Sequence, residues 1–405
     1  MSTALRKIYD AISLVHPIAA ISLTWPMMQP KMQKWRAACR PRFPRNWREY
    51  AEILNQPQWF NYTDYKLGRL IVAAIQATDG SYVTTFSNPQ MLATLNTDML
   101  FMDATFKVIP LAPKAYQFFT ILALVDDTAI PVFWALMERK TTDGYIAALT
   151  YFHQILTPHI RPAIVMTDFE TALLRPIRTI FSEATHKGCF FHFCQAIIHK
   201  LKDLRLFNLI WNWRNGQILL RKFLALALLP AQVIGVTYNW LIQTLPNEIA
   251  NALRPFIVYF RRQWINIISS EQLSIFGLVN RTNNYSEAYN RVLRLRLGPH
   301  PTIWDFTERL TNLLCICHVE YISLRMGNAV RRRAQNHVYE QNEKLQKLWW
   351  LFQEGFLNNV QFLAYASPLL QAFSEANNPD GLNIFGPYDQ HQVFEELNLD
   401  DILIV

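Results

Sequence analysis

The chain has 405 residues, of which 51% are hydrophobic and 13% aromatic, and it carries a net charge of +8. This composition is typical of a packed globular protein of two or three domains and excludes a disordered or repetitive chain. The basic balance favours a polyanionic partner. The five cysteines include no C-x-x-C pair, which argues against a disulfide framework and against a complete zinc finger.

Residues 1–95 are predicted to be mainly helical and irregular. Basic residues cluster between Lys31 and Arg48 and alternate with Trp35, Phe43 and Trp47. Such a mixture suits contact with a nucleic-acid backbone, and a solvated basic face with tucked aromatic side chains is the alternative. The residues that would make the DNA contact are Lys31, Lys34, Arg36, Arg40, Arg42 and Arg45.

From residue 97 the pattern changes to strands. Apolar and β-branched runs predict strands at 100–109, 116–125 and 130–137, the last two joined by a hairpin turn. Helical spacing then predicts helices at 142–156 and 170–181, each followed by a short strand, at 163–167 and 188–193. This order predicts an α/β fold: a mixed five-stranded sheet covered by helices on both faces.

The remaining chain is predicted to be mostly helical. Residues 201–280 are rich in Leu, Ile and Trp at helical spacing and are predicted to form a helical insertion. The uncharged stretch 223–242 could span a membrane by length, but Pro230 and several polar residues favour two buried helices that join near Pro230. The predicted domains are a helical region at 1–95, a core at 96–200, the insertion at 201–280, a core-completing helix and following helices at 281–345, and a helical segment with an acidic tail at 346–405.

Two aspartates occupy notable places in the predicted strands. Asp103 lies in the middle of the apolar run 100–109, where a lone carboxylate is costly unless it is paired, hydrogen-bonded or bound to a metal. A cap or turn at a strand end is the alternative. Asp168 follows the strand 163–167, and ligand-binding groups gather beyond the carboxyl ends of parallel strands. Its alternative role is an N-cap for the helix that begins near Glu170.

A third acid, Glu287, opens a predicted helix. Asn284 as N-cap with Glu287 three residues later would form a capping box, which is the structural alternative. Taken together, Asp103, Asp168 and Glu287 could hold two hard divalent ions such as Mg²⁺ or Mn²⁺. Two such ions stabilise the attacking and leaving oxygens of a phosphoryl transfer without a protein nucleophile. This agrees with the lack of a G-x-S-x-G motif or a phosphate-binding glycine loop in the sequence.

Four motifs follow one another along the chain: Phe-Met-Asp103-Ala-Thr-Phe, Met-Thr-Asp168-Phe-Glu, Gly-Cys189-Phe-Phe-His192-Phe-Cys-Gln and Thr-Asn-Asn284-Tyr-Ser-Glu287. Over roughly residues 97–300 the chain resembles the transposases of Mutator-like elements, the MULE transposase domain. The resemblance implies a ribonuclease-H-like fold with a DDE triad and a helical insertion before the glutamate. It also implies that Asp103, Asp168 and Glu287 are the catalytic acids, with Mg²⁺ or Mn²⁺ in a two-metal site.

The family's Cys-x-x-His signature matches Cys189 and His192. From the residues alone, this pair is either half a metal site or a packed Cys and a hydrogen-bonded His that support the acids, and the supporting role is favoured. Asn284 is grouped with them as a supporting residue. Relatives often carry a zinc-binding DNA-recognition module ahead of the catalytic domain, and residues 1–95 contain no such Cys/His array.

The resemblance implies a nuclear enzyme, a DDE transposase that cleaves and joins DNA strands as a polynucleotidyl transferase. Its partners would be transposon ends and target DNA, with a homo-oligomer expected by analogy and no membrane. The alternative is a transposase-derived DNA-binding or regulatory protein without transposition activity. A general nuclease on the same fold is a third, less favoured reading.

Overall fold

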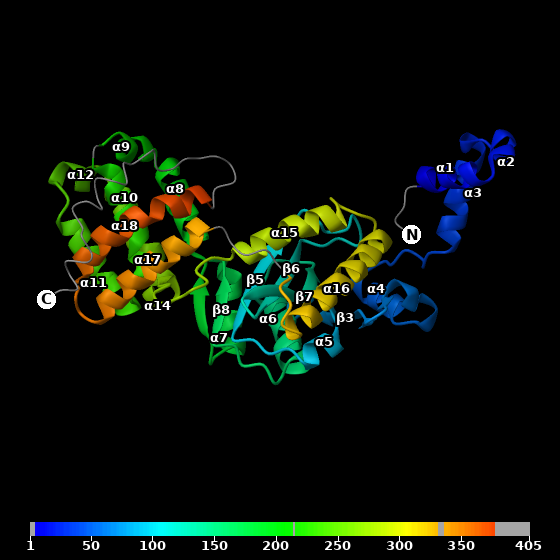
Figure 1. Ribbon diagram of the computed structural model, residues 1–405, viewed down its shortest axis with the longest axis horizontal. Helices are drawn as coiled ribbons and strands as arrows, with labels where there is room; N and C mark the ends of the chain where they lie inside the picture. Colours follow the sequence, from blue (N-terminus) through cyan, green and yellow to red (C-terminus); the bar gives the residue numbers. More distant parts are fainter. Residues whose placement is uncertain (1–4, 214, 331–335, 377–405) are drawn as a thin grey trace. The chain divides into compact units, whose positions relative to one another are not determined.

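The computed structural model describes residues 5–213, 215–330 and 336–376 (Figure 1). The chain divides into two compact units. The first comprises Met1–Cys189 and Thr282–Arg332, and the second comprises Phe190–Arg281 and Arg333–Val405. The acidic tail predicted in the C-terminal segment begins after residue 376 and lies outside the described residues.

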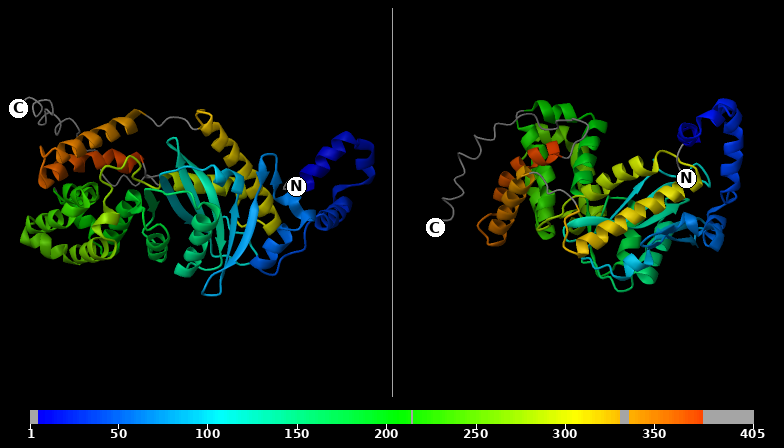
Figure 2. Two further views of the ribbon diagram at one scale, coloured as in Figure 1. Left: turned by 90° about the horizontal axis from the view of Figure 1, so that it is seen from below. Right: turned by 45° about the vertical axis from the view of Figure 1, so that its right-hand side comes forward.

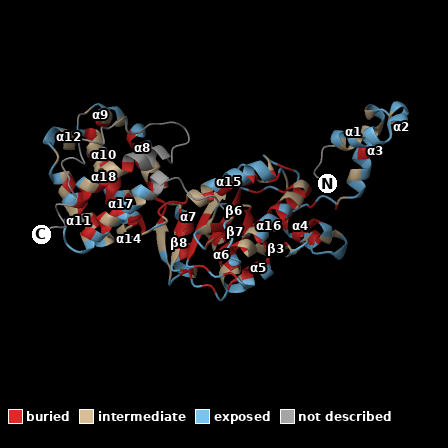
Figure 3. Ribbon diagram, viewed as in Figure 1, coloured by how far each residue is buried: buried red, intermediate tan, exposed pale blue. Residues whose placement is uncertain are grey.

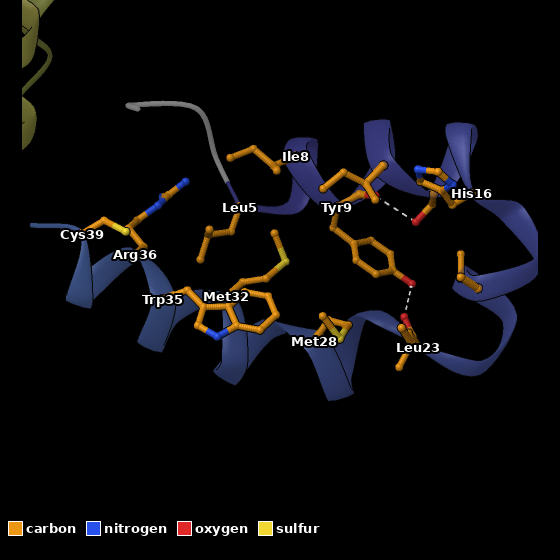
Figure 4. A pocket seen from close by; sticks show the side chains of 14 residues that line it. Leu5, Ile8, Tyr9, His16, Leu23, Met28, Met32, Trp35, Arg36 and Cys39 are labelled. Atoms are coloured by element: carbon orange, nitrogen blue, oxygen red, sulfur yellow. Dashed lines mark hydrogen bonds between the residues drawn. The ribbon is translucent and has the colours of Figure 1, made fainter.

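The first unit begins with helices α1 (Leu5–Val15), α2 (Pro17–Ser22) and α3 (Trp25–Ala38). Apolar side chains of these helices line an open cavity of about 350 Å³, and Leu5, Tyr9 and Met32 point into the space between α1 and α3 (Figure 4). The Tyr9 hydroxyl donates a hydrogen bond to the Leu23 carbonyl at 2.9 Å. Helix α4 (Trp47–Leu54), the 3₁₀ helix η1 (Pro57–Tyr62) and the short hairpin β1 (Asp64–Tyr65) and β2 (Gly68–Arg69) follow.

A mixed sheet forms the centre of the first unit. Among the described residues it has seven strands in the order β3-β4-β7-β6-β5-β8-β9. The pairs β5–β8 and β8–β9 are parallel, and the other neighbours are antiparallel. The strands are β3 (Ile71–Gln76), β4 (Tyr82–Ser87), β5 (Met99–Thr105), β6 (Gln117–Val125), β7 (Thr128–Met137), β8 (Ile164–Thr167) and β9 (Thr185–Gly188).

The sheet differs from the predicted five strands at both ends. Strands β3 and β4 form a hairpin within the region that was predicted to be mainly helical, and β4 extends the sheet by pairing with β7. Gly80, with φ of +80°, lies in the turn between them, where a positive φ favours glycine. The predicted strand 188–193 was wrong in position, because β9 ends at Gly188 and helix α8 begins at Phe190. Short apolar runs cannot be assigned to strand or helix by periodicity alone.

Helices cover both faces of the sheet (Figure 2). On one face, α6 (Thr142–Thr150), its π-helical continuation η2 (Tyr151–Leu156) and α7 (Thr171–Ile180) pack into one buried cluster with side chains such as Leu100 and Met102 of β5. Helices α15 (Asn284–Leu297) and α16 (Ile303–Arg325) cover the other face, where Phe101 packs against Tyr285 with ring centroids 5.2 Å apart. Buried residues concentrate in the sheet between these layers (Figure 3).

The second unit is helical throughout its described residues. An aromatic cluster of Phe223, Tyr238, Phe256 and Phe260 forms part of its core. Two helices join near Pro230, which is the N-cap of α11; α10 is largely buried as predicted, whereas α11 is buried on one side only. No helix in the described part of the chain is long and apolar enough to cross a membrane. The helices are α8 (Phe190–Asp203), α9 (Phe207–Asn212), α10 (Gly216–Ala225), η3 (Leu226–Leu228), α11 (Ala231–Gln243), α12 (Asn247–Ala252), α13 (Arg254–Phe260), η4 (Arg261–Ile267), α14 (Ser270–Leu273), α17 (Asn336–Gln353) and α18 (Asn359–Ala376).

Candidate active site

Asp103 lies inside a strand rather than at a cap or a turn. It is the fifth residue of β5 and pairs in register with Thr120 of β6. Successive side chains of a strand point to opposite faces. Because Leu100 and Met102 pack on the side of α6 and α7, Asp103 points with Phe101 to the side covered by α15. The strand pattern therefore directs this carboxylate toward the helix that carries Glu287.

Two asparagines of the α15 region fix that helix to β5, one at Asp103 itself and the other at the preceding residue, Met102. The Asn290 side-chain amide donates to Asp103 Oδ2 at 2.8 Å. The fully buried Asn283, which is the N-cap of α15, donates its side-chain amide to the Met102 carbonyl at 3.2 Å and accepts from Ser286 Oγ at 2.6 Å. Neither asparagine was singled out in the sequence. Asn290 could have been suspected, because it lies one helical turn beyond Glu287 on the same side of α15.

The three acids predicted from the sequence are brought into one region of the first unit. Burial raises the pKa of Asp103 to about 7, and the nearby carboxylates of Asp168 and Glu287 add to this rise. Hydrogen bonds from the Ala104 backbone N–H, at 2.8 Å, and from Asn290 oppose it. Asp168 and Glu287 therefore both lie near enough to Asp103 to disfavour its ionised form.

Asp168 follows β8, which is parallel to β5, so it lies beyond the carboxyl end of its strand as predicted. Its carboxylate accepts a hydrogen bond from the Glu170 backbone N–H at 3.2 Å, but the N-cap of α7 is Glu170 itself. Asp168 thus shapes the turn before the helix without capping it. A Cβ atom on Gly188 would come within 2.1 Å of the Phe169 ring, so the glycine at the end of β9 makes room for the residue next to Asp168.

Glu170 is a further acid beside Asp168 that sequence reasoning did not select. Burial raises the pKa of Glu170, Asp168 adds to this rise, and Lys140 opposes it. The Lys140 Nζ lies 3.0 Å from Glu170 Oε2. The candidate site therefore has an ion pair between the partly buried Glu170 and the exposed Lys140 beside it, on the side of α6 and α7.

Glu287 lies in the first turn of α15 and is partly buried. The proposed capping box does not form as predicted, because the N-cap is Asn283 and Asn284 is the first helical residue. Asn283 makes the hydrogen bonds described above at the helix start, and the supporting role given to Asn284 stays a prediction.

Cys189 and His192 belong to different units of the chain. The Cys189 thiol is fully buried and its Sγ accepts from the Asn283 backbone N–H at 3.1 Å, so it packs against the start of α15. His192 lies on α8 of the second unit. Cys189 thus contacts the start of the helix that carries Glu287, and the supporting role of Cys189 and His192 stays a prediction.

Half of the basic residues predicted to contact DNA are engaged by carboxylates. Arg40 forms an ion pair with Asp305, and both Arg42 and Arg45 form ion pairs with Glu49. The hydrogen bonds from Arg45 lower the pKa of Glu49. Of the other three, Lys31 and Lys34 are exposed on α3, and Arg36 lines the cavity between α1 and α3.

The donor atoms near Asp103 are carboxylate oxygens, which suit hard divalent ions such as Mg²⁺ and Mn²⁺. Within the described residues, however, no three His, Cys, Asp or Glu side chains are gathered closely enough to hold a metal ion as they stand. The acids thus share one region and act on one another's charge, and their side chains would have to draw together around an ion.

Residues 99–196 match the family model of the MULE transposase domain. The match confirms the resemblance over these residues, and this segment contains Asp103, Asp168, Cys189 and His192. Glu287 lies beyond it in the chain. A search of curated proteins found no match to the chain.

Proposed function

We propose that the first unit is the catalytic part of a MULE-type DDE transposase, a polynucleotidyl transferase that cleaves and joins DNA strands. The observation that carries the proposal is Asp103, a carboxyl group in the middle of a buried strand whose pKa is raised by burial, by Asp168 and by Glu287. Packing does not require a carboxylate at this position, and two further acids beside it increase its cost. A perturbed acid cluster of this kind is a characteristic of functional sites.

The proposed fold is ribonuclease-H-like. Its support is the five-strand part of the sheet β7-β6-β5-β8-β9, in which three antiparallel strands are followed by two parallel ones. The two further strands, β3 and β4, are an addition at one edge. We also propose that the helices of 201–280 are an insertion between Asp168 and Glu287, and that α17 and α18 complete the same helical unit.

Asp103, Asp168 and Glu287 would hold two Mg²⁺ or Mn²⁺ ions. When bound, such ions stabilise the attacking and leaving oxygens of an in-line phosphoryl transfer. A cation would also remove the electrostatic cost of the clustered acids. The chain itself orients the donors: Asn290 and the Ala104 N–H hold the Asp103 carboxylate, and Asn283 fixes the start of the Glu287 helix to β5. DNA in the nucleus is the proposed substrate, with a homo-oligomer as the active form.

The test is DNA nicking by the full chain. Labelled DNA is incubated with the protein and Mg²⁺ or Mn²⁺, and the wild type is compared with Asp168→Asn and with Asp126→Asn, an exposed aspartate in the β6–β7 turn. We expect nicking by the wild type and by Asp126→Asn, and loss of nicking in Asp168→Asn. Binding without nicking by any of the three proteins would favour a transposase-derived DNA-binding protein.

A further inference from the structure

Two exposed aromatic rings lie at the edge of the sheet that carries the candidate site. Phe106 follows the last residue of β5, and Tyr116 precedes the first residue of β6. Because Thr105 pairs with Phe118, both rings emerge at the same edge of the two strands. Their side chains form an edge-to-face pair with centroids 5.6 Å apart, and the residues are 45% and 51% exposed. An edge-to-face pair leaves at least one face of each ring uncovered by the other ring.

A chain of contacts connects these rings with the acids. The Lys140 Nζ lies 5.8 Å from the centre of the Phe106 ring and 3.0 Å from Glu170 Oε2. The Glu170 backbone N–H in turn donates to the Asp168 carboxylate. Along β5, Phe106 is three residues beyond Asp103, which is about 10 Å in an extended strand. The aromatic pair is thus linked through Lys140 and Glu170 to Asp168, and it lies just beyond the carboxyl end of the strand that carries Asp103.

The positive charge around the two rings indicates which kind of molecule binds on them. Lys107 follows Phe106, Lys114 precedes Tyr116 by two residues, and both lysines are exposed, as is Lys140. Lys140 is already paired with Glu170, and an apolar peptide or a second apolar surface would leave Lys107 and Lys114 without complementary charge. A nucleic-acid strand satisfies both features, because its bases stack on aromatic rings and its phosphates attract lysines.

We infer that Phe106 and Tyr116 form a stacking platform for an unpaired base of the DNA strand that enters the acid site, with Lys107 and Lys114 contacting the phosphates. This inference rests on the proposed function. It deepens that proposal by naming the form of DNA that the site prefers, which is a strand with an unpaired nucleotide next to the cleaved position.

The test measures binding of the full chain to two DNA probes in Ca²⁺ without Mg²⁺ or Mn²⁺. One probe is a fully paired duplex, and the other has the same sequence with a short single-stranded gap that contains a fluorescent adenine analogue quenched by stacking. We expect Phe106→Ala and Tyr116→Ala to weaken binding to the gapped probe by about tenfold, the loss of roughly one stacked base. Binding to the paired probe should change by less than about twofold. Quenching of the analogue should be lost in both variants and restored by Phe106→Trp.

Leu111→Ala is the matched control, because Leu111 is a more exposed apolar residue at 71% and has no ring to stack. Equal losses in Leu111→Ala and Phe106→Ala, or equal losses on both probes, would overturn the platform. Unchanged gapped-DNA binding by the aromatic variants would overturn it while leaving nicking by the wild type, and hence the proposed function, intact. Ring-dependent binding by a protein that never nicks DNA would support the platform and contradict only the catalytic role.

Discussion

Replacing Asp103 by Asn should stabilise the metal-free protein, and the gain should depend on pH. Between its ordinary pKa of 3.8 and its raised value of about 7, Asp103 ionises in the unfolded chain but keeps its proton in the folded one. The folded state binds more protons in this window, so the free energy of unfolding falls as pH rises. Below this window the group is protonated in both states and the penalty is absent. Above about pH 7 the penalty is complete.

The size of the effect follows from the pKa difference. A rise of about three pH units at 1.36 kcal/mol per unit corresponds to roughly 4 kcal/mol. Screening by water and salt around a partly buried group reduces this value, and about 2–4 kcal/mol is the expected gain at pH 8. Asn keeps the shape of the protonated acid. An amide flip of Asn290 lets its oxygen accept from the new side-chain NH₂ group while the Ala104 N–H still has an acceptor.

Amide hydrogen exchange of the peptide containing β5, Met99–Thr105, is the appropriate assay, because a chain of two compact units need not unfold in one transition. The difference between Asp103→Asn and wild type should grow from pH 4 to pH 8 in the presence of a chelator. Asp126→Asn, which changes an exposed turn carboxylate, should show no such trend. If Asp103→Asn were no more protected than the wild type at pH 8, or if the difference were independent of pH, the electrostatic description of the site would be wrong.

Three further outcomes test the same reasoning. Asn290→Ala removes a hydrogen bond to an acid on β5 and should lower protection of that strand by about 1–3 kcal/mol, measured by hydrogen exchange against wild type. Asn283→Ala leaves a buried carbonyl without its donor, and a similar loss should extend to the first turn of α15; unaltered exchange there would show that this asparagine does not anchor the helix. DNA affinity should fall steeply with salt, and replacing both Lys31 and Lys34 by Gln should reduce the slope of log affinity against log salt by about 2 if α3 contacts DNA. Arg42→Gln, which removes a cation already paired with a carboxylate, should alter the slope by less than half of the change produced by the double lysine replacement.

The strands β5 to β8 could be predicted because the composition of each run indicates that its residues are buried. The apolar and β-branched runs that form β5, β6, β7 and β8 are buried in the sheet, and their predicted positions agree with the structure to within a few residues. The helices α6 and α7 likewise follow the spacing of their apolar residues. A charged residue inside such a run, as at Asp103, is conspicuous because burial of a carboxylate is costly, so the sequence alone marked it as a candidate.

Contacts between residues far apart in the chain could not be predicted, because no pattern in the sequence indicates them. Asn290 and Asp103 are 187 residues apart, and their hydrogen bond depends on which side of α15 faces β5. Arg40 and Asp305 are 265 residues apart, and only folding shows that this arginine is paired rather than open to a phosphate. The same holds for β4, whose position is decided by pairing with β7, and for the apolar run after Cys189, which could be strand or helix by its own pattern.

The sequence by itself determined which side chains had to be buried and which acids would be costly there. The tertiary structure decided which groups meet those acids. Periodicity records the average environment of each residue along its own element, whereas a hydrogen bond or an ion pair depends on the register and rotation of two elements that no local pattern encodes. For this protein, the sequence was enough to identify the three acids. The asparagines, the lysine and the aromatic rings around them could be identified only from the folded structure.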